Sequence, residues 1–293
     1  MFGNFLDQFW SLTFGGLSLG FIYILIALGY TMVYGVLRMI NFANSEVFMV
    51  GTFATIIIIR DVFKFTQTSE YATGFKLWLI LGTALIASML VSGILSVVIE
   101  LVAYRRLRRK NASRLSSLIS AIGASLFLIE VFRLMSESTD WAFPRLLESK
   151  VLFQISTAYI EQTKLFILIS AIIMMVVLDQ LIQKTRLGRG IRAVSQDERT
   201  AVLMGVNVDK VIAMTFLIGG SLAGAASAFY LLAYESTKFN VGFLLGVAAF
   251  TSAVLGGIGN IRGALAGAFA LGLIQQYASC GVYFAHRLLL LRT

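Results

Sequence analysis

Long apolar runs separated by short polar stretches form the main pattern of this 293-residue chain. The runs that approach or exceed the ~20 residues of a transmembrane helix cover 9–34, 77–104, 115–135, 164–181, 211–232, 241–258 and 263–284. A shorter run, 47–59, follows a polar break that ends at Glu46. The pattern predicts an all-α polytopic membrane protein, a single transmembrane domain over 1–293, with about seven to eight transmembrane or re-entrant helices.

The most polar long interruption, 183–210, carries the signature of a short helix. Ser195 and Glu198 have the spacing of a capping box, in which the Ser195 hydroxyl accepts the Glu198 N–H and the Glu198 carboxylate accepts the Ser195 N–H. Asp197 adds negative charge at the positive end of the helix dipole, and Gly205 offers a left-handed stop. A helix of about nine residues, roughly 13 Å long, is too short to cross a bilayer.

Ala201, Val202 and Met204 give this short helix an apolar side. A helix of this length is marginal alone, so a neighbour has to hold it. Two interpretations follow: the helix lies on its own membrane domain, or it docks on a partner on the same side of the membrane.

Composition and charge agree with a membrane protein. Hydrophobic residues make up 58% of the chain, charged residues 13%, and the mean hydropathy is +0.85; soluble domains have ~25% charged residues. Half of the 24 Lys and Arg residues lie in two loops: Arg105, Arg106, Arg108, Arg109, Lys110 and Arg114 in one, and Lys184, Arg186, Arg189, Arg192, Arg199 and Lys210 in the other. The positive-inside rule explains this net charge of +9 better than nucleic-acid binding does, and it places both loops in the cytoplasm.

The loops at 60–76 and 136–163 are then expected outside, but the end of the chain does not fit the alternation. Eight full spans from an outside N-terminus would leave Arg287 and Arg292 outside, against the positive-inside rule. A re-entrant segment at 242–259 would return the end of the chain to the cytoplasm.

The sequence offers no catalytic constellation. Cys280 and His286 are each the only residue of their type, so a disulfide framework, a zinc site or a nucleophile–base pair cannot be assembled from them. No G-x4-G-K-[ST] phosphate loop occurs. We therefore expect no enzyme activity and no metal or cofactor bound by this chain.

Polar and small residues mark further positions along the apolar runs. Asn41 and Ser45 are candidate N-caps for the helix after the polar break, and Glu46 in its first turn is either a helix-stabilising charge or a functional group. Glu130 and Arg133, three apart, can neutralise each other. Glycines at four-residue spacing let helices approach closely: Gly220 and Gly224, Gly242 and Gly246, and Gly259, Gly263 and Gly267. Three glycines within 255–260 are expected to break a helix.

Several segments together resemble the permeases of branched-chain amino acid ABC importers. They are GYTMVYG at 29–35, MINFA at 39–43, Glu46, Arg192–Ala193, the Ala201-x3-Gly205 spacing and AVLGGIG at 253–259. The resemblance runs from about residue 9 to about residue 275. It implies a multi-pass protein of the bacterial inner membrane. It also implies a second related permease, two ATP-binding cassette subunits that hold ATP and magnesium, and a periplasmic substrate-binding protein as partners.

The resemblance also implies roles for particular residues. Within 183–210 the short helix would be a cytoplasmic coupling helix that docks in a groove of the ATP-binding subunit. The residues assigned to coupling are Arg192, Ala193, Ser195, Asp197, Glu198, Ala201 and Gly205. The residues assigned to the substrate path are Asn41, Asn44, Ser45, Glu46, Gly256, Gly257, Gly259 and Asn260.

The expected function is the permease subunit of an ATP-driven importer of branched-chain, aliphatic amino acids. Alternatives are an ABC permease for amides or urea, and a secondary transporter or channel that would use Glu46 and Glu130. The chain departs from the family where His-Gly is common, at Asn44–Ser45, and where proline is usual, at Arg262. Its end, 276–293, is atypical for the family, and a truncated product is one interpretation of it.

Overall fold

A bundle of long helices forms the fold in the computed structural model, which describes residues 2–39, 41–65, 75–110, 112–146, 151–155 and 158–290. Within these residues, five helices are long and apolar enough to cross a membrane: Phe9–Leu37, Phe75–Arg109, Leu115–Met135, Gln162–Lys184 and Val208–Tyr234. The predicted all-α membrane architecture is therefore confirmed. The predicted count of seven to eight spanning or re-entrant helices is not confirmed, because among the described residues only these five meet the length and composition of a spanning helix; α2 (Ala43–Ile57) and α10 (Val241–Leu255) have 15 residues each.

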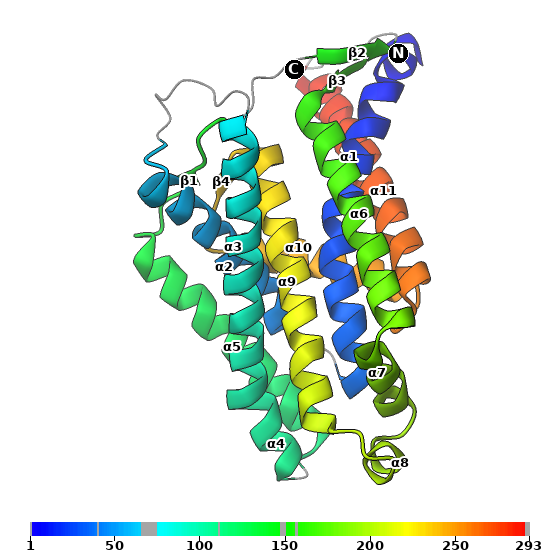
Figure 1. The fold of residues 1–293 in the computed structure, drawn as a ribbon. Coiled ribbons are helices and arrows are strands. Elements are labelled where there is room, and N and C mark those ends of the chain that lie inside the picture. The colour runs from blue at the N-terminus through cyan, green and yellow to red at the C-terminus, as the bar shows by residue number, and fades with distance from the viewer. Residues whose placement is uncertain are drawn as a thin grey trace.

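The two basic loops meet at one end of the bundle. The arginine-rich α4 (Arg105–Arg109) lies there together with α7 (Arg186–Gln196) and α8 (Glu198–Leu203), and the chain termini lie at the opposite end (Figure 1). The shared face agrees with the positive-inside prediction, and we call it the cytoplasmic end. The opposite end is called the outer end.

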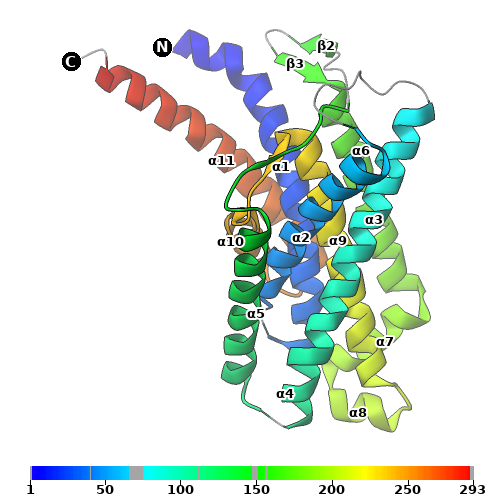
Figure 2. The same cartoon turned by 90° about the vertical axis from the view of Figure 1, so that its left-hand side faces the viewer.

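The central helix α1 (Phe2–Leu37) runs antiparallel to α11 (Ile261–Leu290) through glycine contacts. A Cβ atom on Gly16 would lie 3.0 Å from the Leu273 Cα, and one on Gly20 would lie 3.3 Å from the Ala268 carbonyl oxygen. This pairing carries the end of α11 to the outer end, beside the start of α1 (Figures 1 and 2). The sequence left the side of this end open, and the structure places the end of α11 at the outer end rather than at the cytoplasmic end that a re-entrant segment would have given.

Small residues also join α9 (Val208–Tyr234) to its neighbours. A Cβ atom on Gly220 would lie 2.7 Å from the Ser92 carbonyl oxygen of α3 (Phe75–Ile99), and one on Gly224 would lie 2.4 Å from the Ser88 carbonyl oxygen. The Ser88 hydroxyl donates to the Gly224 carbonyl over 2.7 Å. The close approach predicted for these two glycines is confirmed, and the hydroxyl adds an interhelical hydrogen bond of the kind that membrane helices use.

A glycine turn joins α10 to α11. Gly257 and Gly259 have φ angles of 87° and 92°, a backbone conformation that favours glycine, so the predicted helix break is confirmed. A Cβ atom on Gly267 would lie 2.2 Å from the Ser252 carbonyl oxygen, and one on Gly263 would lie 1.8 Å from the Gly256 carbonyl oxygen. Gly259 has no such neighbour within 4 Å, so it serves the turn rather than the predicted packing face.

Short strands and ion pairs organise the outer end. β1 (Trp141–Ala142) pairs with β4 (Ser236–Thr237), and β2 (Val151–Ile155) pairs with β3 (Ala158–Glu161). Ion pairs Lys238–Asp140 and Arg145–Glu235, both 2.8 Å, link the same two segments. The segment 136–163 therefore lies at the end expected for it, although its strands were not predicted.

The remaining elements complete the bundle. α6 (Gln162–Lys184) leads to the cytoplasmic end, whereas α5 (Arg114–Met135) stands at one edge of the bundle and contacts α2 (Figure 2). Two π-helical turns, η1 (Ile58–Val62) and η2 (Glu100–Tyr104), continue α2 and α3. On α5, Arg133 pairs with Glu130 over 2.9 Å, which confirms the predicted pair.

Candidate functional site

The short helix α8 begins at Asp197 rather than at the predicted Ser195. The Asp197 carboxylate accepts hydrogen bonds from the Arg199 and Thr200 backbone N–H groups over 3.1 and 3.3 Å, and from the Thr200 hydroxyl. The hydroxyl bond, followed by the Arg199 N–H bond, lowers the pKa of Asp197. This cap is an ordinary N-cap, in which a carboxylate accepts from the N2 and N3 amides.

The predicted capping box at Ser195 and Glu198 is wrong because α7 continues through Ser195. The Ser195 hydroxyl donates to the Arg192 carbonyl over 2.8 Å, one turn back in α7. The chain leaves the helical conformation only at Asp197, where φ is −152° and ψ is 117°. Glu198 is consequently the first residue of α8 and is exposed.

Gly205 ends α8 as predicted. Its φ angle is 79°, its N–H donates to the Val202 carbonyl over 2.9 Å, and the Val206 N–H donates to the Ala201 carbonyl over 3.0 Å. These two bonds are the Schellman pattern. With both ends fixed, α8 has 6 residues instead of the nine expected.

At the end of α8, three consecutive apolar side chains point away from the protein. Val202, Leu203 and Met204 are 57%, 86% and 79% exposed; we call these three residues the α8 patch. Ala201 is only 2% exposed and packs inward, so it lies beneath α8 rather than on its outer face. The sequence had drawn attention to Val202 and Met204, whereas Leu203, the most exposed of the three, had been missed.

Polar contacts tie both ends of the coupling loop to the bundle. Arg38, the first residue after α1, donates to the Ser195 and Gln196 carbonyls over 3.0 and 3.4 Å. Asp209, in the first turn of α9, pairs with Arg108 and with Arg109, the latter over 3.1 Å. α8 is therefore held between two anchors, Arg38 directly after α1 and the arginines of α4.

A recess of about 750 Å³ opens beside α7 at the cytoplasmic end. Its lining includes Arg192 and Ser195 of the assigned coupling residues, and Gly259 and Asn260 of the assigned path residues. The Arg192 side chain also donates to the Ile182 carbonyl at the end of α6. The structure thus brings the glycine turn after α10 close to the coupling loop, a proximity that the sequence did not predict. Ala193, next to Arg192 on α7, is half-buried.

The other path residues form a buried polar cluster at the start of α2. Asn41, Asn44, Ser45 and Glu46 are all at most 5% exposed. One Glu46 carboxylate oxygen accepts from the Ser125 hydroxyl over 3.2 Å and lies 3.2 Å from the Ser45 hydroxyl oxygen. The other Glu46 oxygen, both amide atoms of Asn44 and the Asn41 nitrogen have no hydrogen-bond partner among the described residues.

Neither predicted N-cap of α2 is the cap, because the helix has Phe42 at that position without a side-chain cap. The Asn41 oxygen accepts from the Ala43 N–H over 3.1 Å and from the Tyr104 hydroxyl over 3.0 Å, so it does serve the start of α2. Ser45 is no cap, because it lies inside the helix and donates to the Phe42 carbonyl over 2.6 Å. Glu46 binds hydroxyl groups rather than backbone N–H groups, so its side chain caps no helix end either.

Helix α10 closes over this cluster through two glycines. A Cβ atom on Gly242 would lie 2.6 Å from Glu46 Oε2, and one on Gly246 would lie 2.2 Å from the Ser45 Cβ. The close approach predicted for Gly242 and Gly246 is therefore confirmed, and their partner is α2. Ser125 had not been singled out, because a serine within an apolar run carries no signal of its partner.

Comparisons with known proteins give one consistent result. Residues 12–291 match the family described as branched-chain amino acid transport system, permease component. The chain is 38% identical over 269 residues to the high-affinity branched-chain amino acid transport system permease protein LivH of Salmonella typhimurium, covering 91% of this chain and 84% of that protein. LivH of Escherichia coli K12 is 39% identical over the same shares, and BraD of Pseudomonas aeruginosa is 39% identical over 267 residues, or 90% and 84% of the two chains. No solved structure matches.

Proposed function

The chain belongs to the family of branched-chain amino acid transport system permease components, and we propose that it forms the membrane path of an ATP-driven importer of branched-chain amino acids. The match over residues 12–291 is the observation that carries this proposal. The curated relatives are all described as branched-chain amino acid permease proteins, which favours these substrates over amides and urea.

The energy for transport would come from ATP hydrolysis by a partner subunit. The chain has no phosphate loop, and its cytoplasmic end carries the exposed α8 patch. Exposed apolar side chains rimmed by polar residues mark interaction sites. We assign the α8 patch as the contact for an ATP-binding cassette subunit, with Asp197 and Gly205 fixing the shape of α8. The full importer would hold two such subunits with their ATP and magnesium, a second permease and a periplasmic binding protein, in the bacterial inner membrane.

The buried polar cluster at the start of α2 is the proposed substrate contact. A zwitterionic amino acid could place its carboxylate at the N-terminus of α2 and its ammonium group at Glu46, an arrangement used at broken helices in transporters. Unpaired polar atoms of Asn44 and Glu46 support this assignment, because buried polar groups normally have partners. Since the cluster is closed in this conformation, α5 or α10 would have to move to admit a substrate.

Uptake by the reconstituted importer tests the function. The chain is co-expressed with the candidate second permease, ATP-binding and binding-protein subunits, and ATP-dependent uptake of labelled leucine is measured against acetamide and urea. Leucine uptake that requires all subunits supports the proposal. Uptake that persists without the ATP-binding subunit and follows an ion gradient would identify a secondary transporter instead, and preferred uptake of acetamide or urea would overturn the substrate.

A further inference from the structure

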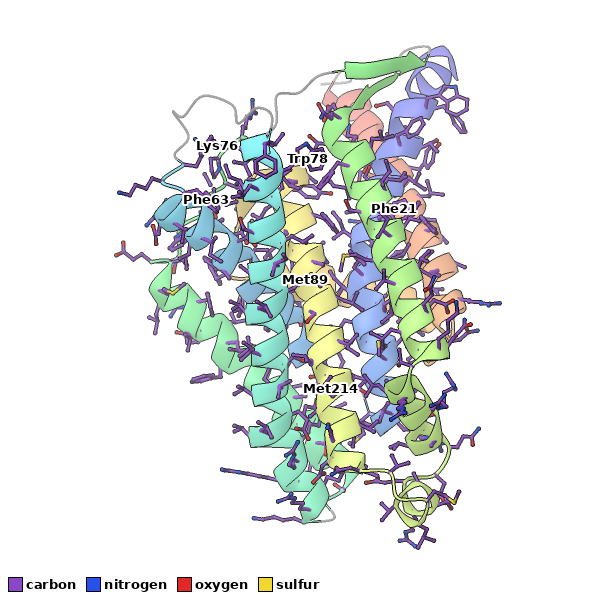
Figure 3. All side chains as sticks on the ribbon, in the orientation of Figure 1. Phe21, Phe63, Lys76, Trp78, Met89 and Met214 are labelled. Atoms are coloured by element: carbon purple, nitrogen blue, oxygen red, sulfur yellow. The ribbon has the colours of Figure 1, made fainter. Side chains whose placement is uncertain are left out.

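One side of α3 is built to face lipid. Large apolar side chains are exposed at helical spacing along it and into η2, which continues it: Trp78, Ile86, Leu90, Ile94 and Val98 in α3, and Val102 in η2. Trp78 and Val102 are separated by about 36 Å along the helix at 1.5 Å per residue, enough to cross the ~30 Å hydrocarbon core with a moderate tilt. Figure 3 shows Lys76 and Trp78 at the outer end of α3.

The same helix carries a cluster of cations directly beyond Val102. α4 continues α3 through η2 and has the sequence RRLRR, followed by Lys110. Arg106, Arg109 and Lys110 are exposed. A helix that passes from a lipid-facing stripe into exposed cations places those cations at the level of the inner-leaflet headgroups.

Ion pairs hold α4 in a fixed position. Glu100 is fully buried, and it binds Arg105 over 2.9 Å and Arg108 over 3.7 Å. Asp209 binds Arg108 and Arg109. A five-residue helix would not be stable alone, so these contacts to η2 and α9 fix which α4 side chains point outward.

Two cations of this cluster have no carboxylate to neutralise them. Among the residues that the structure describes, Arg106 and Lys110 make no ion pair, while Arg105, Arg108 and Arg109 share Glu100 and Asp209. Five cations face two carboxylates, so the cluster keeps an excess of three positive charges. Cations in this position attract phosphate groups of anionic lipids.

We propose that α4 and Lys110 form a binding surface for anionic phospholipid of the inner leaflet, with Arg106 and Lys110 as the groups that contact the headgroup phosphate. The lipid-facing stripe of α3 favours a lipid over the ATP-binding subunit as the occupant, because the acyl chains can lie along Leu101 and Val102, which are both exposed. The proposal concerns the chain alone and does not depend on its transport function.

Lipid enrichment tests the proposal. The purified full chain is incubated with mixed vesicles of phosphatidylglycerol and phosphatidylcholine, and the lipids that remain bound are counted by mass spectrometry. We expect enrichment of phosphatidylglycerol that declines with salt. Each of Arg106→Gln and Lys110→Gln should weaken phosphatidylglycerol binding about fivefold, and the double variant about 25-fold.

Lys76→Gln is the matched control, because it removes one exposed cation from the opposite end of the same helix. It should leave the enrichment unchanged, as should the charge-preserving pair Arg106→Lys and Lys110→Arg. Equal loss in Lys76→Gln, no enrichment in the unaltered chain, or enrichment insensitive to salt would overturn the proposal. If the double variant fails to fold, the two single variants compared with Lys76→Gln decide the matter. Loss of ATP-binding subunit co-purification with unchanged lipid enrichment would assign the surface to that subunit instead.

Discussion

Truncation of Leu203 should weaken docking of the ATP-binding subunit without affecting the folding of this chain. The change Leu203→Ala removes three carbon groups at ~0.8 kcal/mol each on burial. Because Leu203 is 86% exposed, nearly all of this is available to a partner and almost none of it to the fold of the chain. If docking buries the side chain, the loss is about 2 kcal/mol, which is about a 30-fold weaker affinity for the ATP-binding subunit.

The assay is the dissociation constant between the soluble ATP-binding subunit and the chain reconstituted in lipid nanodiscs. Leu90→Ala is the matched control, since Leu90 is an exposed leucine on the lipid-facing side of α3 and its truncation should leave the affinity unchanged. Met204→Ala should behave like Leu203→Ala. If Leu203→Ala binds as tightly as the unaltered chain, the α8 patch does not contact the ATP-binding subunit, and the reasoning from exposure is refuted.

Three further outcomes are expected. Glu46→Gln should reduce uptake at least tenfold at unchanged expression and complex yield, whereas Glu130→Gln should not; equal uptake by both would deny Glu46 a place in the path. Asp197→Ala should accelerate amide hydrogen exchange in α8 severalfold and Ser195→Ala should not, a contrast that would be reversed if the capping box existed. Gly256→Val should lower the thermal stability of the purified chain, because a Cβ atom there would lie 2.0 Å from the α11 backbone; an unchanged melting temperature would contradict that packing.

The features that the sequence predicted well are those set by short-range pattern. Membrane helices can be recognised in the sequence because each needs about 20 apolar residues of its own to cross the bilayer. The two basic loops can be recognised because the positive-inside rule counts Lys and Arg in each loop separately. Gly205 is another such case, since a left-handed stop depends on a single residue. The four-residue glycine spacing likewise indicated close contacts, although it could not name the partner helix of Gly242 or Gly220.

The predictions that failed concern features that depend on contacts between helices. Ser195 and Glu198 have the right spacing for a cap, but α7 extends through Ser195, and Asp197, with a carboxylate that can accept from two amides, begins the new helix. The outward end of α11 follows from its antiparallel contact with α1, which outweighs the charge of the chain's last residues. For Ser125, its contact with Glu46 arises only when α5 lies against α2, so no local pattern could have revealed it.

The buried cluster at α2 also has a continuous set of contacts to the cytoplasmic end. Arg38 holds the carbonyl end of α7 next to α8 and belongs to the segment that follows α1. Tyr30 of α1 packs against Phe250 of α10, with their ring centroids 6.1 Å apart. Phe42, at the start of α2, contacts the same Phe250 ring over 5.6 Å. Because α10 meets Glu46 through the narrow contact at Gly242, a small shift of α1 against α10 would change the space around the unpaired Glu46 oxygen. Packed helices move as discrete units rather than by gradual deformation. If the proposed ATP-binding subunit displaces α8, these contacts would give that motion a physical route to the proposed substrate contact at this cluster.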